Sequence, residues 1–529
     1  MSRTIRSKAL LGAGVASIAA AWIACSKPDP APAPSTNTPA ATTPATSGGA
    51  NVLQHHKNAT RDGLYVEPAL TRAAAASLHR DSTFNASIQG PTYAQLLYFE
   101  GGPGGADVVI AATEQNRVYA LDARHGAVLW QQQLGTPAPL GGSGVCGNID
   151  PLGITGTPVI DAASRTLFLD AMTSGGGSSR RHVVHALSLD DGSSRAGWPI
   201  DAASFQSGGT RFNAPFQSQR SALLLQSRVL YVPYGGHFGD CGDYRGWVVG
   251  LPLDNPSAAQ AFATSARGGG IWAPGGLASD GSSVYAATGN TFGTGGSWGH
   301  GEGILRFQPG PAFSASARDY FAPSNWLALD NGDVDVGGSG PVLIDVPGAT
   351  PSALLLVLGK NGVAYLLDRS NLGGFGAGNG TAGEGVASAR VASNAIINAA
   401  AAYTTNQGSY AVMIGAGVGC SGGAGDLVAI RISASAPPQI AVAWCGRMNG
   451  RGSPMVTTTD GRSEAIVWAV GAESSNRLIG LDGDTGAVVF AGGGGAEAMA
   501  TVRRFSTPIA AKGRIFVASD SAVYAFTTQ

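Results

Sequence analysis

The chain is poor in charged residues and in long apolar runs, and each shortage excludes a class of protein. Asp, Glu, Lys and Arg make up 13% of the 529 residues, and the net charge is −1. Such a chain has no excess of positive charge with which to bind nucleic acid. Low charge combined with 79 glycines also argues against a disordered or mainly helical protein. Beyond Ala24, no segment is apolar for long enough to cross a bilayer.

The N-terminus has the pattern of an export signal, with a positively charged start and a short apolar run over residues 10–24. The run ends at Cys25 in a sequence that resembles a bacterial lipobox, whose cysteine is lipidated after cleavage. Trp22 stands where leucine is usual, so ordinary signal cleavage is the alternative. By the same resemblance, Ser26 implies the outer membrane. We therefore expect residues 1–25 to be a signal peptide, and the protein to be an exported outer-membrane lipoprotein facing the periplasm or the cell surface.

The next segment, residues 26–61, begins with a stretch rich in Pro, Ala, Thr and Ser. A segment of this composition cannot bury enough apolar surface to offset the entropy of ordering it. We expect it to be a flexible tether. The folded domain is then expected over residues 62–529.

One short apolar strand pattern recurs eight times in this domain, with copies 45 to 66 residues apart. The copies begin at Val118, Val184, Val248, Ile304, Ala364, Leu427, Leu478 and Val523. A long period built from strands and turns is typical of a radial array of small sheets. The sequence therefore predicts an all-β protein, an eight-bladed β-propeller of four-stranded antiparallel blades.

The chain stops just after the last copy, at Gln529, so the final blade lacks an outer strand. The region of residues 78–90, which precedes the first blade, is available to supply that strand. A ring closed by an N-terminal strand would leave no open sheet edge at the seam. We therefore predict this closure.

Five long insertions fall in connections that open on one face of a propeller. They are residues 136–155, 235–245, 290–303, 323–338 and 418–425. Loops on a rigid scaffold usually carry function, so we expect the functional surface on this face. His237, His300 and Glu302 lie in these loops and would form a metal site with Asp240 and Asp243 only if all of them converge.

Four cysteines remain after Cys25, and none has the close spacing of a zinc knuckle or redox pair. Outside the cytoplasm, four cysteines can form two disulfides in three connectivities. We predict a Cys420–Cys445 bond within one repeat and a Cys146–Cys241 bond. Free buried thiols are the alternative.

With the repeat in place, the chain resembles the β-propellers of the pyrroloquinoline quinone (PQQ) type, which include quinoprotein alcohol dehydrogenases and a non-enzymatic outer-membrane assembly lipoprotein. Trp272 and Asn290, which are 290 − 272 = 18 residues apart, stand where those dehydrogenases have a tryptophan under the quinone and a calcium-binding asparagine. The segment 241–247, which includes Arg245 as a cofactor contact, is similar to one that carries a calcium-binding glutamate. Cys241 occupies that place, so Asp240 or Asp243 would have to substitute.

The resemblance also implies a catalytic aspartate, for which Asp330, Asp333 and Asp335 are the candidates. Such a residue would act as the general base that takes the alcohol proton. The alternative is a solvated acidic turn, in which Asp and Gly make local hydrogen bonds.

The chain departs from the dehydrogenases in three respects. It lacks their adjacent cysteine pair, it has Leu277 and Ala278 in place of a tyrosine–aspartate pair, and it has no haem-binding motif. We therefore expect a monomeric binding scaffold without catalysis or cofactor. Its loop face would bind a protein or another macromolecule, and its only membrane contact would be a lipid anchor. The alternative is a PQQ- and calcium-dependent dehydrogenase of alcohols or sugars.

Overall fold

The computed structural model describes residues 49–141, 145–175, 180–378, 383–420 and 425–529. The predicted signal peptide, the lipidation candidate Cys25 and residues 26–48 of the predicted tether lie outside this part. Residues 49–529 form one compact unit. Among the described residues there are two short α-helices, α1 (Arg72–Ala75) and α2 (Trp326–Asn331). None of the helices described is long and apolar enough to span a membrane.

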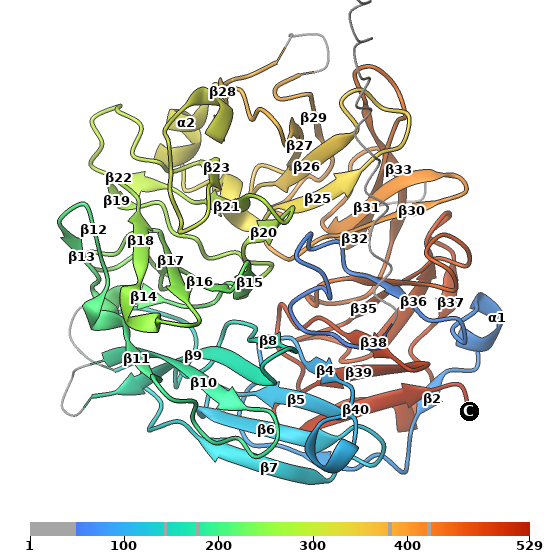
Figure 1. Ribbon diagram of the computed structural model, residues 1–529. Coiled ribbons are helices and arrows are strands. Elements are labelled where there is room, and N and C mark those ends of the chain that lie inside the picture. The colour runs from blue at the N-terminus through green and yellow to red at the C-terminus, as the bar shows by residue number, and fades with distance from the viewer. Residues whose placement is uncertain (1–48, 142–144, 176–179, 379–382, 421–424) are drawn as a thin grey trace, which may run out of the picture. The chain divides into compact units, whose positions relative to one another are not determined.

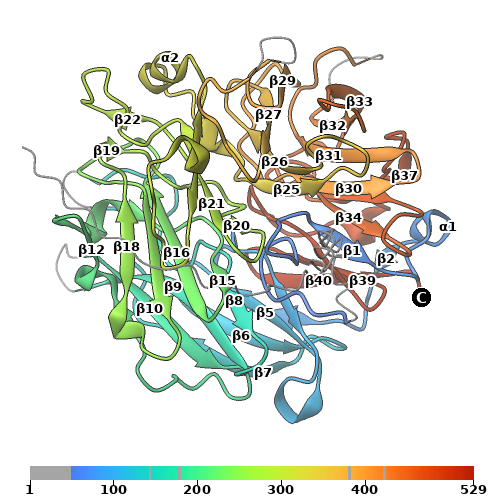
Figure 2. The same cartoon turned by 45° about the horizontal axis from the view of Figure 1, so that its top comes forward.

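Eight of the ten sheets described in this unit are blades of a ring, and the other two are two-stranded pairs (Figures 1 and 2). Blade 1 consists of β4 (Leu97–Phe99), β5 (Val108–Ala112), β6 (Arg117–Asp122) and β7 (Val128–Gln133). Blade 2 has β8 (Val159–Asp161), β9 (Thr166–Ser174), β10 (Arg180–Ser188) and β11 (Ile200–Asp201). Blade 3 has β15 (Leu224–Gln226), β16 (Val229–Gly236), β17 (Trp247–Pro252) and β18 (Gln260–Ala263). Blade 4 has β20 (Ala278–Ser279), β21 (Val284–Thr288), β23 (Gly303–Phe307) and β24 (Tyr320–Ala322).

The second half of the ring repeats this plan. Blade 5 consists of β25 (Val342–Asp345), β26 (Ala353–Leu358), β27 (Val363–Asp368) and β29 (Ala387–Arg390). Blade 6 has β30 (Ala401–Thr405), β31 (Gly408–Ile414), β32 (Leu427–Ile432) and β33 (Ile440–Gly446). Blade 7 has β34 (Met455–Thr458), β35 (Ile466–Val470), β36 (Leu478–Asp482) and β37 (Val488–Phe490). Blade 8 has β38 (Ile509–Ala511), β39 (Arg514–Ala518) and β40 (Ala522–Thr527).

Short additional strands lie beside the blades or in the loops between them. They are β14 (Gln217–Ser218) beside β16, β28 (Gly374–Phe375) beside β24, the hairpin of β12 (Gln206–Ser207) and β13 (Thr210–Arg211), and the pair β19 (Arg267–Gly268) and β22 (Thr291–Phe292).

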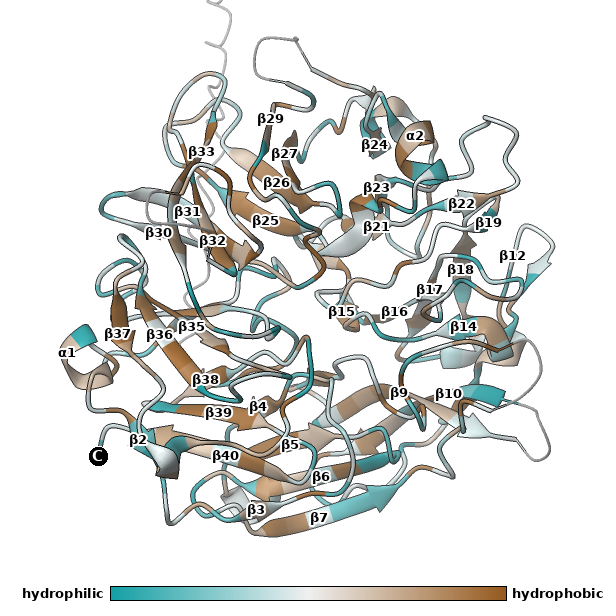
Figure 3. Cartoon of the chain, turned by 180° about the vertical axis from the view of Figure 1, so that it is seen from behind, coloured by the Kyte–Doolittle hydropathy of each residue, from teal (hydrophilic) through white to brown (hydrophobic). Residues whose placement is uncertain are grey.

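Each of the eight copies of the sequence repeat lies in the third strand of its blade. These strands read as nearly continuous apolar runs because both faces of a blade are covered by neighbouring blades. In β36, for example, Leu478 to Leu481 are all buried. Figure 3 shows this as hydrophobic colour along the strands. The predicted eight-bladed β-propeller is therefore confirmed.

The apolar core is divided into clusters, most of which lie between one pair of adjacent blades. Between blades 6 and 7, Tyr403, Val412 and Ala429 pack with Val456 and Val467. The cluster at the seam is continuous from blade 7 through blade 8 into blade 1. Burial of apolar surface therefore holds the ring together across the join as well as elsewhere.

The outer edge of blade 8 is completed by the N-terminal region, as the sequence predicts. Strands β2 (His79–Arg80) and β3 (Ala86–Ser87) pair antiparallel with β40, with Arg80 opposite Phe526 and Ala86 opposite Val523. The last strand thus gains the partner that its own blade does not supply.

Residues 52–67 run along the inner strands and contact every blade, ending in β1 (Leu64–Val66), which pairs parallel with β34. Their main-chain oxygens accept hydrogen bonds from blades 2, 4, 5, 6 and 7, through the N–H groups of Ile160, Ser279, Leu343, Ala402 and Val456. The same segment makes hydrogen bonds to the other three blades. Val52 bonds to Tyr98 of blade 1, the Arg61 side chain bonds to blade 3, and the Glu67 side chain bonds to blade 8. Residues 52–61, which the sequence places in the tether, therefore complete the inner edges of the blades.

Both predicted disulfides are present. Cys146–Cys241 joins the loop after blade 1 to a loop of blade 3, and Cys420–Cys445 closes a loop within blade 6; each has a Cα–Cα distance of 5.9 Å. The predicted pairing is confirmed, and it suits an oxidising compartment.

Candidate functional site

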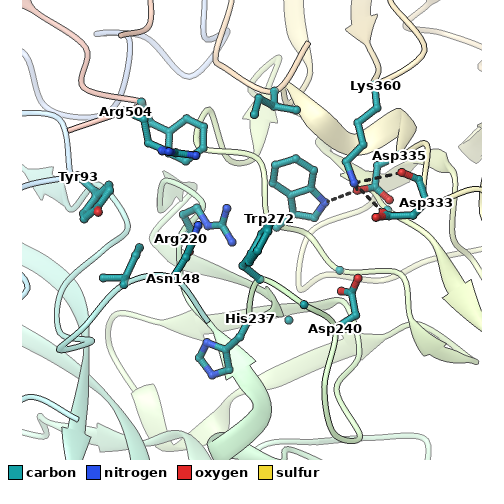
Figure 4. Close-up of a pocket in the computed structure, with 18 of the residues that line it drawn as sticks. Tyr93, Asn148, Arg220, His237, Asp240, Trp272, Asp333, Asp335, Lys360 and Arg504 are labelled. Carbon is teal, nitrogen blue, oxygen red and sulfur yellow. Dashed lines mark hydrogen bonds and ion pairs between the residues drawn. The ribbon is translucent and has the colours of Figure 1, made fainter. Parts of the chain in front are cut away.

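A cavity of about 670 Å³ opens among the loops of one face of the ring. Four of the five predicted loops line it: residues 136–155, 235–245, 290–303 and 323–338. The described part of loop 418–425 does not contribute. Chain segments just before the inner strands of several blades complete the wall, among them Tyr93, Arg220, Trp272 and Phe505 (Figure 4).

Trp272 and Asp335 form the centre of this cavity. The indole Nε1 donates to Asp335 Oδ2 at 3.1 Å, and the main-chain N–H of Asn290 donates to Asp335 Oδ1 at 2.8 Å. Gly289 allows this approach, because a Cβ there would lie 2.8 Å from Asp335 Oδ1. Three of the residues singled out by the family resemblance, Trp272, Asn290 and Asp335, therefore meet at one point.

Lys360, from the turn between β26 and β27, is the third member of this group. Its Nζ lies 2.7 Å from Asp335 Oδ2 and 2.7 Å from Asp333 Oδ1. Burial alone would lower the pKa of Lys360, but the two carboxylates outweigh burial and raise that pKa above its ordinary value. The ammonium is therefore a permanent counter-ion of Asp335.

The three candidate catalytic aspartates have different positions. Asp335 is buried in the cavity wall, whereas Asp333 is exposed at its rim and pairs with Lys360. Asp330 does not line the cavity; its Oδ1 accepts hydrogen bonds from the N–H and hydroxyl of Thr291 at 2.6 and 2.8 Å. Only Asp335 is thus positioned beside Trp272.

The remaining candidate residues also lie in different places relative to the cavity. Asp240 lines the cavity and accepts a hydrogen bond from the Tyr244 hydroxyl at 2.5 Å. Asp243 is exposed and lies outside the lining. Arg245 also lies outside it, and its guanidinium donates to the carbonyls of Thr264 and Ser265 at 3.0 and 2.7 Å. Arg245 therefore braces a loop in this structure.

Glu302 lies behind the cavity wall, with one carboxyl oxygen unpaired among the described residues. The side chain is fully buried, its Oε2 accepts the Val336 N–H at 2.7 Å, and its Oε1 has no hydrogen-bond partner among the described residues. Burial, and then the Asp335 charge, raise the pKa of Glu302 well above its usual value. The carboxyl is therefore held protonated at neutral pH.

This pKa shift predicts a pH-dependent stability. A carboxyl with a raised pKa in the folded state contributes stability below the unfolded value of 4.5 and loses it as the pH rises through the folded value. Glu302→Gln, which mimics the protonated form, should match wild type at about pH 5 and exceed its stability by about 1–3 kcal/mol at about pH 8. Urea unfolding at both pH values measures this; equal curves for the two proteins at high pH would contradict it.

The donor atoms at this site do not fit a calcium ion. Calcium takes about six to eight oxygen ligands, but both Asp335 oxygens already accept hydrogen bonds from nitrogen donors, and Lys360 places a positive charge against this carboxylate. Cys241, at the place of the family's glutamate, is in a disulfide. No group of three or more His, Cys, Asp or Glu side chains in the described part of the chain is arranged to hold a metal. By contrast, the Trp272 indole offers a platform that fits a flat ring.

The opposite wall of the cavity has three arginines, two of which are paired with carboxylates. Arg503 pairs with Asp520, its Nε 2.8 Å from Oδ1, and Arg504 pairs with Glu473, its Nε 2.9 Å from Oε1. Arg220 lies nearby, with its Cζ 5.5 Å from the centre of the Trp272 ring. Figure 4 shows Arg220 and Arg504 on one side of Trp272 and Lys360 with the aspartates on the other.

Sequence reasoning did not identify Lys360, Arg220, Arg503 or Arg504 as site residues. The sequence does contain a signal for the arginines, because they lie directly before inner strands. In blade 8, for example, the inner strand opens with a small residue and proline, in Ser506-Thr507-Pro508. In this structure all three arginines line the cavity. Lys360 has no such signal, because it lies in an ordinary hairpin turn.

No protein-family model and no curated protein matches the chain. Solved structures with a similar fold include the quinohemoprotein alcohol dehydrogenase of Comamonas testosteroni, with 14% identity, 90% of this chain and 80% of that chain covered, and a TM-score of 0.56. The quinohemoprotein alcohol dehydrogenase ADHIIG of Pseudomonas putida has 12% identity, 90% and 80% coverage, and a TM-score of 0.58. A europium-containing methanol dehydrogenase has 14% identity, 89% coverage of both chains and a TM-score of 0.57. At this level of identity the likeness shows the fold alone: the chain is an eight-bladed β-propeller of the kind found in PQQ-type quinoproteins.

Proposed function

We propose that this protein is a binding protein whose ligand is a small organic molecule with a flat ring, held in the central cavity on Trp272. The observation that carries the proposal is the group of Trp272, Asp335 and Lys360, which lines a cavity of about 670 Å³. A well-formed pocket with aromatic surface and a few convergent polar groups is the usual form of a small-molecule site.

The chemistry of the group defines what it can hold. An indole binds flat rings by stacking. Trp272 and Lys360 both bind Asp335 Oδ2, whereas among the described residues Oδ1 accepts only the Asn290 N–H and so keeps a lone pair for a ligand hydroxyl or amino group. The exposed Phe238 at the cavity lining offers further apolar surface to such a ring. Neither role requires a chemical step.

The proposal also includes the cellular location of the protein. Two disulfides support an exported protein, and the sequence predicts lipid anchoring at Cys25. The loop face that surrounds the cavity would be the contact surface for a macromolecular partner, with the ligand bound beneath it.

A quinone-dependent dehydrogenase is the second candidate. One observation favours it: Trp272, Asn290 and Asp335 converge as the resemblance implies, and the similar structures are named as quinoprotein or methanol dehydrogenases. The calcium misfit argues against it, so we derive no reaction step.

PQQ, a flat aromatic carboxylate, is a suitable probe for both candidates. We expect saturable quenching of tryptophan fluorescence by PQQ, with the same Kd in Ca²⁺ and in chelator, and no dye reduction with alcohols. Trp272→Ala should weaken binding by about 10- to 100-fold through the lost stacking, and Trp298→Ala, a tryptophan outside the cavity lining, should leave it unchanged. Absence of PQQ binding to the wild type would overturn the central-cavity proposal. Calcium-dependent binding with alcohol-driven dye reduction would replace it by the dehydrogenase.

A further inference from the structure

Arg220 differs from the other arginines of the cavity in having no acceptor of its own. It lies just before β15, and none of its guanidinium nitrogens makes a hydrogen bond or ion pair within the described part of the chain. Its Nε is completely buried. Arg503 and Arg504, by contrast, are each paired with a carboxylate, Asp520 and Glu473.

Arg220 is half-buried, and its guanidinium lies near two aromatic rings whose faces attract a cation. Its Cζ lies 5.5 Å from the Trp272 ring centre and 5.9 Å from the Phe505 ring centre. Burial lowers the pKa of Arg220 from its ordinary value, which reflects the loss of solvation of the charged form. The aromatic contacts leave the guanidinium N–H groups, including the buried Nε, without a hydrogen-bond acceptor, which buried polar groups normally have. An anionic group of a ligand would be that acceptor.

Neighbouring polar groups suit the same anion. Tyr93 and Asn148 also line the cavity and lie on the same side of it as Arg220 in Figure 4. The Tyr93 hydroxyl makes no hydrogen bond to another described residue. His237 contributes no positive charge, because burial lowers its pKa to about 3. Arg220 is therefore the lining cation that makes no ion pair or hydrogen bond among the residues described, although the charges of Glu114 and Asp240 act on it from a greater distance.

The opposite side of the cavity has the reverse character. Asp240, Asp333 and Asp335 line it, and Lys360 offsets only part of their charge. Carboxylates accept hydrogen bonds from hydroxyl groups and repel other anions. Trp272 lies between the two sides (Figure 4). The cavity thus offers a cation at one end, a stacking surface in the middle and acceptors at the other end.

We propose that the ligand is a hydroxylated organic acid, with its carboxylate against Arg220, its ring on Trp272 and its hydroxyl groups towards Asp335 and Asp240. This inference rests on the proposed function and names its ligand class. Aromatic hydroxy acids have all three features, while sugar acids share the carboxylate and the hydroxyl groups and offer the indole the apolar face of a puckered ring in place of a flat one. A guanidinium binds a carboxylate through two parallel hydrogen bonds, which gives both affinity and orientation.

The test compares each acid with a neutral counterpart of the same shape, by titration calorimetry on the full chain. One arm uses 4-hydroxybenzoate against 4-hydroxybenzamide, and the other uses glucuronate against glucose. In at least one arm, the acid should bind about 10- to 100-fold more tightly than the neutral compound, as expected for a charge-assisted pair. The arm in which the acid binds more tightly shows whether the ligand is an aromatic acid or a sugar acid.

Variants then assign the preference to Arg220. Arg220→Met should reduce the acid-to-neutral ratio to near one, and Arg220→Lys should retain part of it. Arg228→Met, an exposed arginine of the same blade that pairs with Asp254, is the matched control and should keep the full ratio. Circular dichroism checks that each variant is folded, and the ratio in the wild type needs no variant at all.

Two outcomes would overturn the inference: equal binding of acid and neutral compounds to the wild type, or no binding of either acid up to about 10 mM. Equal binding that is nevertheless lost in Trp272→Ala would leave the ring-binding function intact and reject only the acid. Loss of both kinds of binding, together with failure of the PQQ titration, would reject the function itself.

Discussion

Replacement of Arg61 by alanine is expected to lower the free energy of unfolding by about 3–5 kcal/mol. Arg61 is 1% exposed and lies among the inner strands. Its Nε donates to Leu277 O at 2.7 Å in blade 4, and another nitrogen donates to Leu223 O at 2.8 Å in blade 3. A third bond, to His55 O at 2.8 Å, ties the N-terminal segment to both blades.

The expected loss follows from buried carbonyls left without a donor and from the cavity that the side chain would leave. Urea unfolding of wild type, Arg61→Ala and Arg61→Lys measures it, and lysine should recover only part because it lacks the forked geometry. Arg228→Ala, which breaks an exposed ion pair, should cost less than about 1 kcal/mol. A similarly small cost for Arg61→Ala would show that residues 52–67 do not brace the ring.

The second large effect is expected at Lys360. Lys360→Met leaves Asp335 buried without its counter-ion, since the Asp335 side chain is only 4% exposed. Removing one partner of a buried pair is strongly destabilising, and the partial exposure of Lys360 reduces the cost to about 2–3 kcal/mol. We expect the same substitution to weaken ligand binding, because Asp335 loses its fixed position.

A double-mutant cycle separates this pair from general damage. Asp335→Asn alone should also destabilise the protein, but Lys360→Met combined with Asp335→Asn should be less destabilised than the sum of the two single changes. Lys512→Met, in an exposed ion pair with Asp107, serves as the control lysine. Additive effects of Lys360→Met and Asp335→Asn would contradict the coupling that the structure shows.

The sequence was sufficient to predict the ring but not the whole of its inner surface. The eight repeats mark third strands because these strands are buried on both faces and must be apolar. Residues 52–61 gave no such signal. They are largely polar, yet they are ordered because the inner strands present unpaired main-chain groups that any segment can satisfy.

The site was predicted in part for a similar reason. Trp272 and Asn290 were predicted through family resemblance, which gave Asp335 as one of three candidate aspartates, and Cys420–Cys445 was predicted because both cysteines lie in one repeat. Lys360 was missed because a single charged residue in a hairpin turn looks like a surface residue in a sequence, and Arg220 was missed because its place just before an inner strand was not used as a signal. Their function depends on the closure of the ring, which brings blades 3 and 5 towards one cavity. Only the folded chain shows that Arg220 lacks a partner.

A crystal structure of the full chain grown with the tighter-binding acid tests the central claim most directly. The account predicts the ring of the acid on Trp272, its carboxylate within hydrogen-bond distance of the Arg220 guanidinium, and its hydroxyl groups facing Asp335. The reverse orientation, with the carboxylate on Lys360, or a ligand bound outside the cavity, would contradict it.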